Sequence, residues 1–136
     1  MRHAHADWPG YSGEDFDRPL TAQGLADAAA SARDMREAGQ MPVRIIASPA
    51  RRTRQTAEVV ARELGLQADA VQFVDALYNA SISTLWRELQ QASAAGLVLL
   101  IAHNPGISGL ARQLSRDVSR ASFPPGGWDR FPAPGK

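Results

Sequence analysis

The chain has 136 residues, of which 44% are hydrophobic and 21% are charged, and its formal net charge is +1. This composition is typical of one globular domain, and it excludes a strongly basic nucleic-acid surface and a membrane-spanning run of about 20 apolar residues. The lack of cysteine excludes disulfides and thiol chemistry. No secretory signal is recognisable at the start, so we expect a cytoplasmic protein that binds neither nucleic acid nor membrane.

The first predicted element after the amino terminus is a loop over residues 6–18, which are polar and contain Pro9, Gly10 and Gly13. A helix should follow, because Thr21 can cap its amino end and Gly39 can end it. Between these two residues, apolar side chains recur at helical spacing. They are Leu25, Ala28, Ala29, Ala32 and Met35.

The next two elements are a strand and a helix. Residues 43–47, with the sequence VRIIA, form a β-branched run that predicts a strand. Ser48 and Pro49 then indicate a helix that Ser48 caps and that stops at Gly65. The inner face of this helix should carry Thr53, Thr56, Val60 and Leu64.

The second half of the chain repeats this alternation. A weaker strand is expected at residues 71–74, and a loop at 75–79. Residues 97–102, with the sequence LVLLIA, are apolar throughout, as in a parallel strand that is buried on both faces. A helix that ends at Gly96 precedes this strand, and a short helix follows it. Their apolar stripes are Leu85, Trp86, Leu89 and Ala92, then Ile107, Leu110, Ala111 and Leu114.

The last segment, residues 122–136, is rich in proline and glycine and has neither helical nor strand periodicity. We therefore expect one domain over residues 1–121 and a tail over 122–136 that is disordered or loosely draped over the domain. Within the domain, strands alternate with helices, which predicts an α/β fold with a mainly parallel central sheet flanked by helices.

Polar residues follow two of the predicted strands directly. The segment Ser48–Arg52 comes after strand 43–47, and His103 comes after strand 97–102. In parallel sheets, ligands bind beyond the carboxyl ends of the strands. We therefore expect these side chains to face a common crevice.

The residue types in this crevice suit phosphoryl transfer, in which catalysis is mostly positioning and neutralisation of oxygen charge. Arg52 lies one turn into a predicted helix, whose amino end also attracts anions. A neutral imidazole at His3 could attack phosphorus while Arg2 holds the oxygens. His103 could donate a hydrogen bond to the same oxygens, particularly when protonated.

Four motifs occur in an order that resembles the histidine phosphatase superfamily, the phosphoglycerate-mutase-like enzymes. Within it, the chain looks most like the small SixA-type phosphohistidine phosphatases, from Arg2 to about Leu114. The motifs are Arg2-His3-Ala4, Arg18-Pro19-Leu20-Thr21, Ser48-Pro49-x-x-Arg52-x-x-Gln55-Thr56 and His103-Asn104-Pro105-Gly106.

The resemblance implies a role for each of the candidate site residues. His3 would be the nucleophile that becomes phosphorylated, while Arg2, Arg52 and His103 would line the phosphate pocket. Arg18 would be a further contact to the substrate phosphate. The implied reaction removes a phosphoryl group from a protein phosphohistidine, with small phosphate esters also possible. No metal or organic cofactor is implied, because arginines neutralise the phosphoryl charge.

The general acid remains open at this stage. Larger relatives use a glutamate from a loop, and no glutamate here has a clear equivalent position. The four candidates are Asp7, Asp15, Asp17 and Asp75. We hypothesise that a phosphohistidine substrate, whose leaving group is an imidazole, needs less help from an acid than a substrate with an alkoxide leaving group. Arg18 could also simply pair with Asp15 or Asp17, and the roles of Tyr78 and Asn79 stay undecided.

The start of the chain departs from the resembled family, in which a buried strand precedes the Arg-His pair. Here Met1 takes its place, so we expect the first strand to be missing, either because the true start lies upstream or because this is a truncated relative. A phosphate- or phosphoprotein-binding module without turnover is one alternative. Another is a square-planar Cu(II) or Ni(II) site formed by the amine, two amides and the imidazole of Met1-Arg2-His3.

Overall fold

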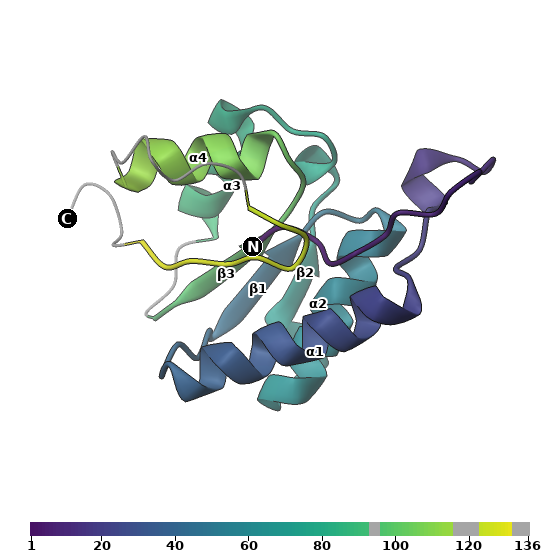
Figure 1. Cartoon of the computed structure of the whole chain (residues 1–136). Coiled ribbons are helices and arrows are strands. Elements are labelled where there is room, and N and C mark those ends of the chain that lie inside the picture. Colours follow the sequence, from purple (N-terminus) through teal and green to yellow (C-terminus); the bar gives the residue numbers. More distant parts are fainter. Residues whose placement is uncertain (93–95, 116–122, 132–136) are drawn as a thin grey trace.

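The computed structural model describes residues 1–92, 96–115 and 123–131 of the chain. Within these ranges, three parallel strands form a sheet in the order β2-β1-β3, between helices (Figure 1). The strands are β1 (Arg44–Ala47), β2 (Val71–Phe73) and β3 (Val98–Ile101). The structure thus confirms the predicted α/β class with a parallel central sheet.

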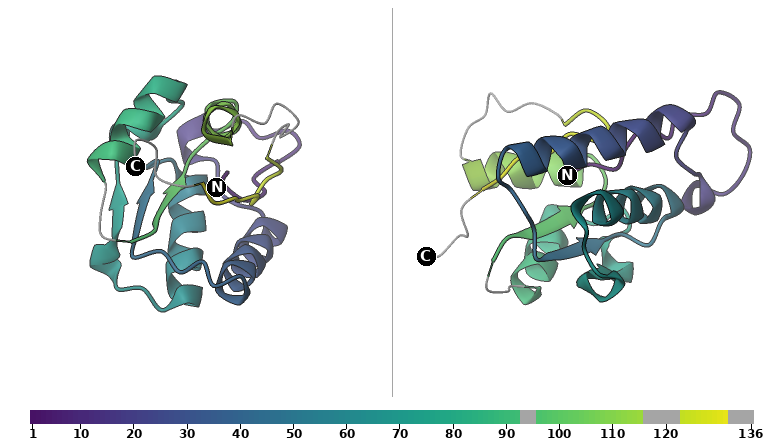
Figure 2. Two further views of the ribbon diagram at one scale, coloured as in Figure 1. Left: turned by 90° about the vertical axis from the view of Figure 1, so that its left-hand side faces the viewer. Right: turned by 90° about the horizontal axis from the view of Figure 1, so that it is seen from below.

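The α-helices of the described ranges lie in two pairs. They are α1 (Ala22–Glu37), α2 (Arg51–Leu64), α3 (Ile82–Gln91) and α4 (Gly106–Ser115). Helices α1 and α2 cover one face of the sheet, while α3 and α4 cover the other (Figure 2). Helix α3 ends at Gln91, before Gly96, where we expected this helix to end. Residues 93–95 and 116–122 lie outside the described ranges.

The alternation of side chains along the sheet explains why β3 and residues 45–47 of β1 are apolar, whereas Arg44 at the start of β1 is exposed. Ile45 and Ile101 point into the core beneath α1 and α2, whereas Ile46 and Leu100 point into the core beneath α3 and α4. Successive side chains of a strand face opposite sides of the sheet, so a strand covered on both faces needs apolar residues at every position. Trp86 packs against the core beneath α3 and α4, as its place in the apolar stripe of the helix predicted.

Short 3-10 turns occupy part of the predicted loops. The turn η1 (Asp15–Asp17) lies within residues 6–18, and η3 (Asp75–Leu77) within residues 75–79. A further turn, η2 (Ala68–Ala70), leads into β2. The loop with η1 projects away from the sheet in both figures.

Helix starts follow the predicted caps in one case and not in another. Thr21 caps α1, because its side chain accepts a hydrogen bond from the Gly24 N–H. Helix α2 instead begins at Arg51 without a side-chain cap, so the prediction that Ser48 caps it was wrong. The Ser48 hydroxyl lies 2.8 Å from a ring nitrogen of His103 and therefore forms a hydrogen bond with that side chain instead.

Helix α1 also turns a different face inward at its first turn than we predicted. Leu25 is 42% exposed, while Gly24 is buried. A Cβ atom at Gly24 would lie only 2.1 Å from the His5 carbonyl oxygen, so only glycine allows this approach. The inner position at this turn is therefore occupied by the backbone of the amino-terminal segment.

The amino-terminal residues lie beside β3. Arg2 and Ala102 form one isolated parallel bridge, and the Met1 amine donates to the Leu100 carbonyl at 2.8 Å. The Met1 side chain is buried in the core beneath α1 and α2. Where we expected the first strand to be missing, residues 1–3 thus pair with β3 over a single bridge.

Residues 123–131 contact the other side of the amino-terminal segment, although we expected a tail without fixed contacts. The Arg2 N–H donates to the Gly127 carbonyl at 3.0 Å, and the Gly126 N–H donates to the His3 carbonyl at 2.9 Å. Trp128 packs against the core beneath α1 and α2. These bonds use backbone groups, which periodicity in the side chains does not report; residues 122 and 132–136 lie outside the described ranges.

No helix in the described part of the chain is long and apolar enough to cross a lipid bilayer.

Candidate active site

His3 lies at the edge of the sheet where β3 ends. Its backbone N–H donates to the Ala102 carbonyl at 3.1 Å, and the residue is only 8% exposed. The ring nitrogen Nδ1 lies 2.7 Å from the Ala4 carbonyl oxygen. Because a carbonyl oxygen can only accept, Nδ1 carries the proton and Nε2 keeps its lone pair. The ring therefore offers Nε2 as a nucleophile.

The charge state of His3 also suits a nucleophile. Burial lowers the pKa of His3 to about 4; the hydrogen bond to Ala4 opposes this shift, and the charges of Arg52, Arg2 and Arg18 add to it. The imidazole is therefore uncharged at neutral pH, the form that can attack phosphorus. The same electrostatic interactions show that three guanidinium groups act on this ring.

His103 stands next to His3, with 5.5 Å between the ring centroids. Its Nε2 lies 2.8 Å from the Ser48 hydroxyl oxygen, which also accepts a long hydrogen bond of 3.4 Å from the Ala50 N–H. The Ser48 hydroxyl has one proton to donate and no other acceptor among the described residues, and the His103 tautomer that accepts it at Nε2 carries its own proton on Nδ1. The buried Nδ1 has no hydrogen-bond partner among the described residues.

His103 is also uncharged at neutral pH. Burial lowers its pKa to about 3, and the nearby charge of Arg52 contributes to the shift. We expected His103 to donate to phosphoryl oxygens particularly when protonated. In the tautomer that accepts from Ser48 at Nε2, it can donate through Nδ1 without a second proton.

Arg2 and Arg52 each carry a buried donor without a partner. Arg2 donates from Nη1 to the Phe123 carbonyl at 3.1 Å, and Arg52 donates from both terminal nitrogens to Asp15. The Nε atoms of both arginines are buried and lack a partner among the described residues. A buried donor without a partner costs about 1–3 kcal/mol, so an anion that accepted these hydrogen bonds would be favoured.

Asp15 is the one general-acid candidate that contacts the proposed phosphate-binding residues. Its carboxylate lies 3.0 Å from Arg52 Nη2, 3.2 Å from Arg18 Nη2 and 2.6 Å from the Tyr78 hydroxyl. The hydrogen bond from Tyr78, with those from Arg52 and Arg18, lowers the pKa of Asp15 to about 2 against the opposing effect of partial burial. Asp15 is thus ionised at neutral pH and holds no proton to donate.

Of the other predicted residues, Arg18 joins these contacts and the remaining aspartates do not. Arg18 donates to the Ala6 carbonyl and to Asp15, the pairing that we left open beside its implied role as a phosphate contact. Asp7, Asp17 and Asp75 are exposed, and no side-chain bond joins them to the proposed pocket within the described ranges. The structure therefore does not single out a general acid.

Tyr78, which the sequence left undecided, belongs to the wall of the site. Its ring meets His103 edge-on, with centroids 5.5 Å apart, and meets Phe16 in the same way at 5.1 Å. Asn79 is exposed and has a positive φ of 50°, so it serves the turn after η3. A tyrosine in a predicted loop gave no signal that it would contact a residue 63 positions earlier in the chain.

Two motif residues to which we gave no role in the site connect the motifs by hydrogen bonds. Gln55 accepts from the Leu20 N–H at 2.7 Å, and Thr56 accepts from the Ala4 N–H at 3.1 Å. They thereby tie helix α2 to two of the other motifs. Their fixed spacing after Arg52 was the available signal, because positions 52, 55 and 56 share one side of a helix.

The amino terminus does not fit the square-planar metal alternative. That site requires the free amine and the amides of Arg2 and His3, but all three donate hydrogen bonds to carbonyl groups of the fold. The prediction is therefore wrong for the folded chain. Within the described residues, no cluster of three or more His, Cys, Asp or Glu side chains could hold a metal ion.

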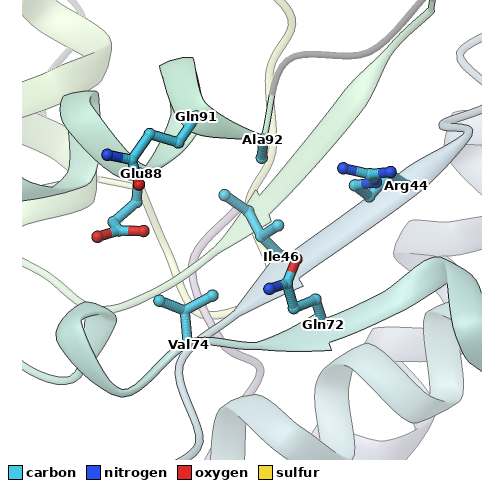
Figure 3. A pocket seen from close by; sticks show the side chains of 7 residues that line it. All are labelled: Arg44, Ile46, Gln72, Val74, Glu88, Gln91 and Ala92. Atoms are coloured by element: carbon cyan, nitrogen blue, oxygen red, sulfur yellow. The ribbon is translucent and has the colours of Figure 1, made fainter.

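A separate hollow lies between α3 and the strands β1 and β2 (Figure 3). None of the predicted site residues lines it. Its lining residues are Arg44, Ile46, Gln72, Val74, Glu88, Gln91 and Ala92. It is therefore distinct from the site around His3.

Comparison with known proteins agrees with this geometry. The model of the histidine phosphatase superfamily (branch 1) matches residues 1–82, which include three of the four motifs. An uncharacterised chloroplastic protein of Arabidopsis thaliana is 38% identical over 80 residues, or 58% of this chain and 37% of that protein. An uncharacterised Picosynechococcus protein is 31% identical over 103 residues, or 75% of this chain and 62% of that protein. The chain thus spans less than two thirds of the length of either relative.

Two solved structures share the fold and more than a quarter of the aligned residues. A protein from Agrobacterium tumefaciens assigned as the phosphohistidine phosphatase SixA is 27% identical, with a TM-score of 0.79 over 93% of this chain and 84% of that one. A protein histidine phosphatase SixA complexed with tungstate is also 27% identical, with a TM-score of 0.72 over 84% and 73% of the two chains. On the family match, the motifs and the fold, the chain belongs to the histidine phosphatase superfamily.

Proposed function

We propose that this chain is a phosphatase that removes a phosphoryl group from a protein phosphohistidine through a phosphohistidine intermediate on His3. The proposed roles are His3 as nucleophile and Arg2, Arg52 and His103 as ligands of the phosphoryl oxygens. Arg18 is proposed as a further contact to the substrate phosphate. The name of the SixA relatives suggests the substrate class, and a small phosphate ester is the alternative substrate.

One observation carries the proposal. The buried side-chain nitrogens without a partner in the described residues are Arg2 Nε, Arg52 Nε and His103 Nδ1. All three belong to residues that we selected from sequence motifs, and all are donors. The charges of Arg2 and Arg52 lower the pKa of His3, and the His103 ring lies next to the His3 ring, whose Nε2 keeps a lone pair. A phosphoryl group has the oxygens to accept from these donors and a phosphorus atom for Nε2 to attack.

The first proposed step transfers the phosphoryl group to the protein. The lone pair of His3 Nε2 forms a bond to phosphorus, and the bond from phosphorus to the substrate imidazole breaks. The electron pair leaves with that imidazole, which departs as the neutral ring, either because its second nitrogen already carries a proton or because solvent protonates the leaving nitrogen. Donors that are already in place stabilise the charge on the transferred oxygens, which is the main catalytic requirement of this reaction.

The second proposed step restores the free enzyme. Water attacks phosphorus, the bond to Nε2 breaks, and inorganic phosphate leaves with the proton balance completed by solvent. The hydrogen bond from His3 Nδ1 to the Ala4 carbonyl supports this step, because it keeps the proton on Nδ1, so that His3 leaves phosphorus as a neutral imidazole. Neither step needs a proton from Asp15.

A binding module without turnover is the second candidate, since the same arginines would hold a phosphoprotein. The fixed tautomer of His3 favours the enzyme, because binding alone does not require a free lone pair at Nε2. Turnover therefore separates the two functions.

The test compares the unaltered chain with His3→Ala, using a phosphohistidine peptide and para-nitrophenyl phosphate as substrates. The matched control is His5→Ala, which removes an imidazole whose one side-chain hydrogen bond among the described residues joins its Nδ1 to Thr21. We expect His3→Ala to lose about 10⁴-fold or more in turnover, as for other nucleophiles, while His5→Ala keeps most of it. Rapid quenching should also trap phosphate on His3 of the unaltered chain.

Equal and undetectable turnover by both proteins would refute the phosphatase. If both still bound inorganic phosphate, the binding module would be the better description.

A further inference from the structure

We propose that Asp15 is a positioning residue for the phosphoryl site, because it holds Arg52 so that the Nε edge of the guanidinium group faces the transferred phosphoryl group. The proposal rests on the proposed function. It assigns the exposed loop with η1 a part in catalysis through Arg52, without direct contact between Asp15 and the substrate.

The contacts at Arg52 are the first argument. This residue is 3% exposed, and its two terminal nitrogens both donate to Asp15: Nη1 to the backbone carbonyl at 2.7 Å and Nη2 to the carboxylate at 3.0 Å. Two parallel bonds to one residue fix the plane of a guanidinium group. The Nε–H is left without a partner among the described residues.

The contacts at Asp15 are the second argument. The Tyr78 hydroxyl donates to the same carboxylate oxygen that Arg52 contacts, at 2.6 Å, and Arg18 reaches the other oxygen at 3.2 Å. Asp15 is therefore held from three directions. Tyr78 in turn packs edge-on against His103, so its hydrogen bond connects Asp15 to the wall of the site.

Charge supplies the third argument. A buried guanidinium cation is costly unless a partner of opposite charge compensates it. Asp15 supplies that charge at neutral pH, since its hydrogen bonds keep its pKa near 2. Its carboxylate can nevertheless stay in place when an anion arrives, because the donors proposed for the anion are different nitrogens. Asp15 thus compensates Arg52 without occupying the Nε edge.

The decisive variant is Asp15→Asn, which keeps the shape of the side chain but removes its charge. Glu14→Gln is the matched control, because Glu14 is the exposed neighbour and no side-chain hydrogen bond or ion pair of this residue is found among the described residues. With the phosphohistidine peptide, we expect Asp15→Asn to lower kcat by about 10- to 100-fold and to change KM by less than about threefold. A misplacement of about 1 Å suffices for such a loss in kcat.

A double variant tests whether the effect passes through Arg52. In an Arg52→Lys background, the second change Asp15→Asn should cost less than about twofold in kcat, because lysine cannot form the paired contact. Tyr78→Phe should lower kcat by a smaller factor, about two- to fivefold, because it removes one of three donors to Asp15. Asp15→Glu, which keeps the charge, should restore part of the lost rate.

A readout without turnover separates this proposal from the proposed function. Proton–nitrogen NMR spectra of the arginine Nε–H groups, with the Arg52 signal assigned by its loss in Arg52→Lys, report whether Arg52 is held. The Arg52 signal should shift when inorganic phosphate is added to the unaltered chain. It should broaden or move in Asp15→Asn and stay in place in Glu14→Gln.

The possible results lead to different conclusions. No turnover by the unaltered chain, together with the expected NMR changes, would refute the phosphatase and leave the positioning of Arg52 supported. Unchanged kcat in Asp15→Asn, or tighter phosphate binding with equal or faster turnover, would overturn the proposal. The second of these results would mean that Asp15 competes with phosphate for Arg52.

Discussion

The inner side of the candidate pocket is built from buried strand ends and the first turns of α2, whereas its outer side is the exposed loop of residues 7–18. Ser48, Thr53 and Thr56 are completely buried on the inner side. On the outer side, Trp8 is 41% exposed and Phe16 is 40% exposed. Both sides meet at Arg52, whose backbone belongs to α2 and whose terminal nitrogens are held by Asp15.

This difference indicates how the two sides contribute. Packing and hydrogen bonds orient the inner residues, so changes there should alter stability and chemistry together. The outer loop is held by a few polar and aromatic contacts, so changes away from Asp15 should be mild. The following predictions test that division.

The largest expected effect is the dependence of stability on pH, which comes from the inner side. The folded-state pKa values of His3 and His103 are about 4 and about 3, below the ordinary value of 6.5. The unfolded chain therefore binds more protons than the folded chain as pH falls below about 6.5, and the free energy of unfolding decreases. Each pKa unit is worth about 1.4 kcal/mol, so we expect a loss of several kcal/mol between pH 7 and pH 4.

Urea unfolding at pH 7, 5.5 and 4.5 measures this loss. The Met1 amine, whose pKa burial lowers to about 5, acts in the same direction. His3→Gln and His103→Gln each remove one of the two imidazoles. Each variant should show a weaker dependence of the free energy of unfolding on pH. If the free energy of unfolding fell with pH as steeply in both variants as in the unaltered chain, the inner imidazoles would not be the cause.

An intermediate effect is expected for Ser48→Ala, also on the inner side. The change removes the hydroxyl at 2.8 Å from His103 Nε2, which favours the proton on Nδ1 and fixes the ring. We expect kcat/KM to fall about tenfold, which corresponds to about 1.4 kcal/mol and is typical of a lost buried hydrogen bond. Ser81→Ala, a capping serine on α3, is the control for serine removal and should leave kcat/KM unchanged. Wild-type kcat/KM in Ser48→Ala would contradict the role of Ser48.

The smallest effect is expected for Trp8→Phe on the outer side. This change removes the hydrogen bond from the indole Nε1 to the Pro19 carbonyl, at 2.8 Å, and keeps an aromatic ring. Exposed contacts of this kind contribute little, so the free energy of unfolding should change by less than about 0.5 kcal/mol. Thermal melting and turnover assays check this expectation. A large loss of either property would mean that the outer loop is as tightly coupled to the core as the inner side.

Much of the fold was predictable because its signals are local. Thr21 and Gly65 marked a helix start and a helix end, and the β-branched run at 43–47 and the apolar run at 97–102 located two parallel strands. The contacts of residues 123–131 were not predictable, because they run through backbone atoms of Gly126 and Gly127 rather than through a side-chain pattern. Leu25 was assigned to the wrong face, because the backbone of His5 approaches Gly24 instead.

The candidate site divides in the same way. The motifs selected His3, Arg2, Arg52 and His103, and the structure places unpartnered donors of the last three around His3. The motifs did not indicate that Ser48 contacts His103 rather than capping α2. They also did not rank the four aspartates, of which Asp15 alone joins Arg52.

The sequence by itself determined the order of strands and helices and the residue types at the strand ends, because periodicity, caps and motif spacing are properties of neighbouring residues. Only the tertiary structure decided which nitrogen of each ring is available and what holds each arginine. Those features depend on contacts between residues far apart in the chain: Arg52 and Asp15 are 37 positions apart, His103 and Ser48 55, and Tyr78 and Asp15 63. Such contacts form only when packing brings the segments together.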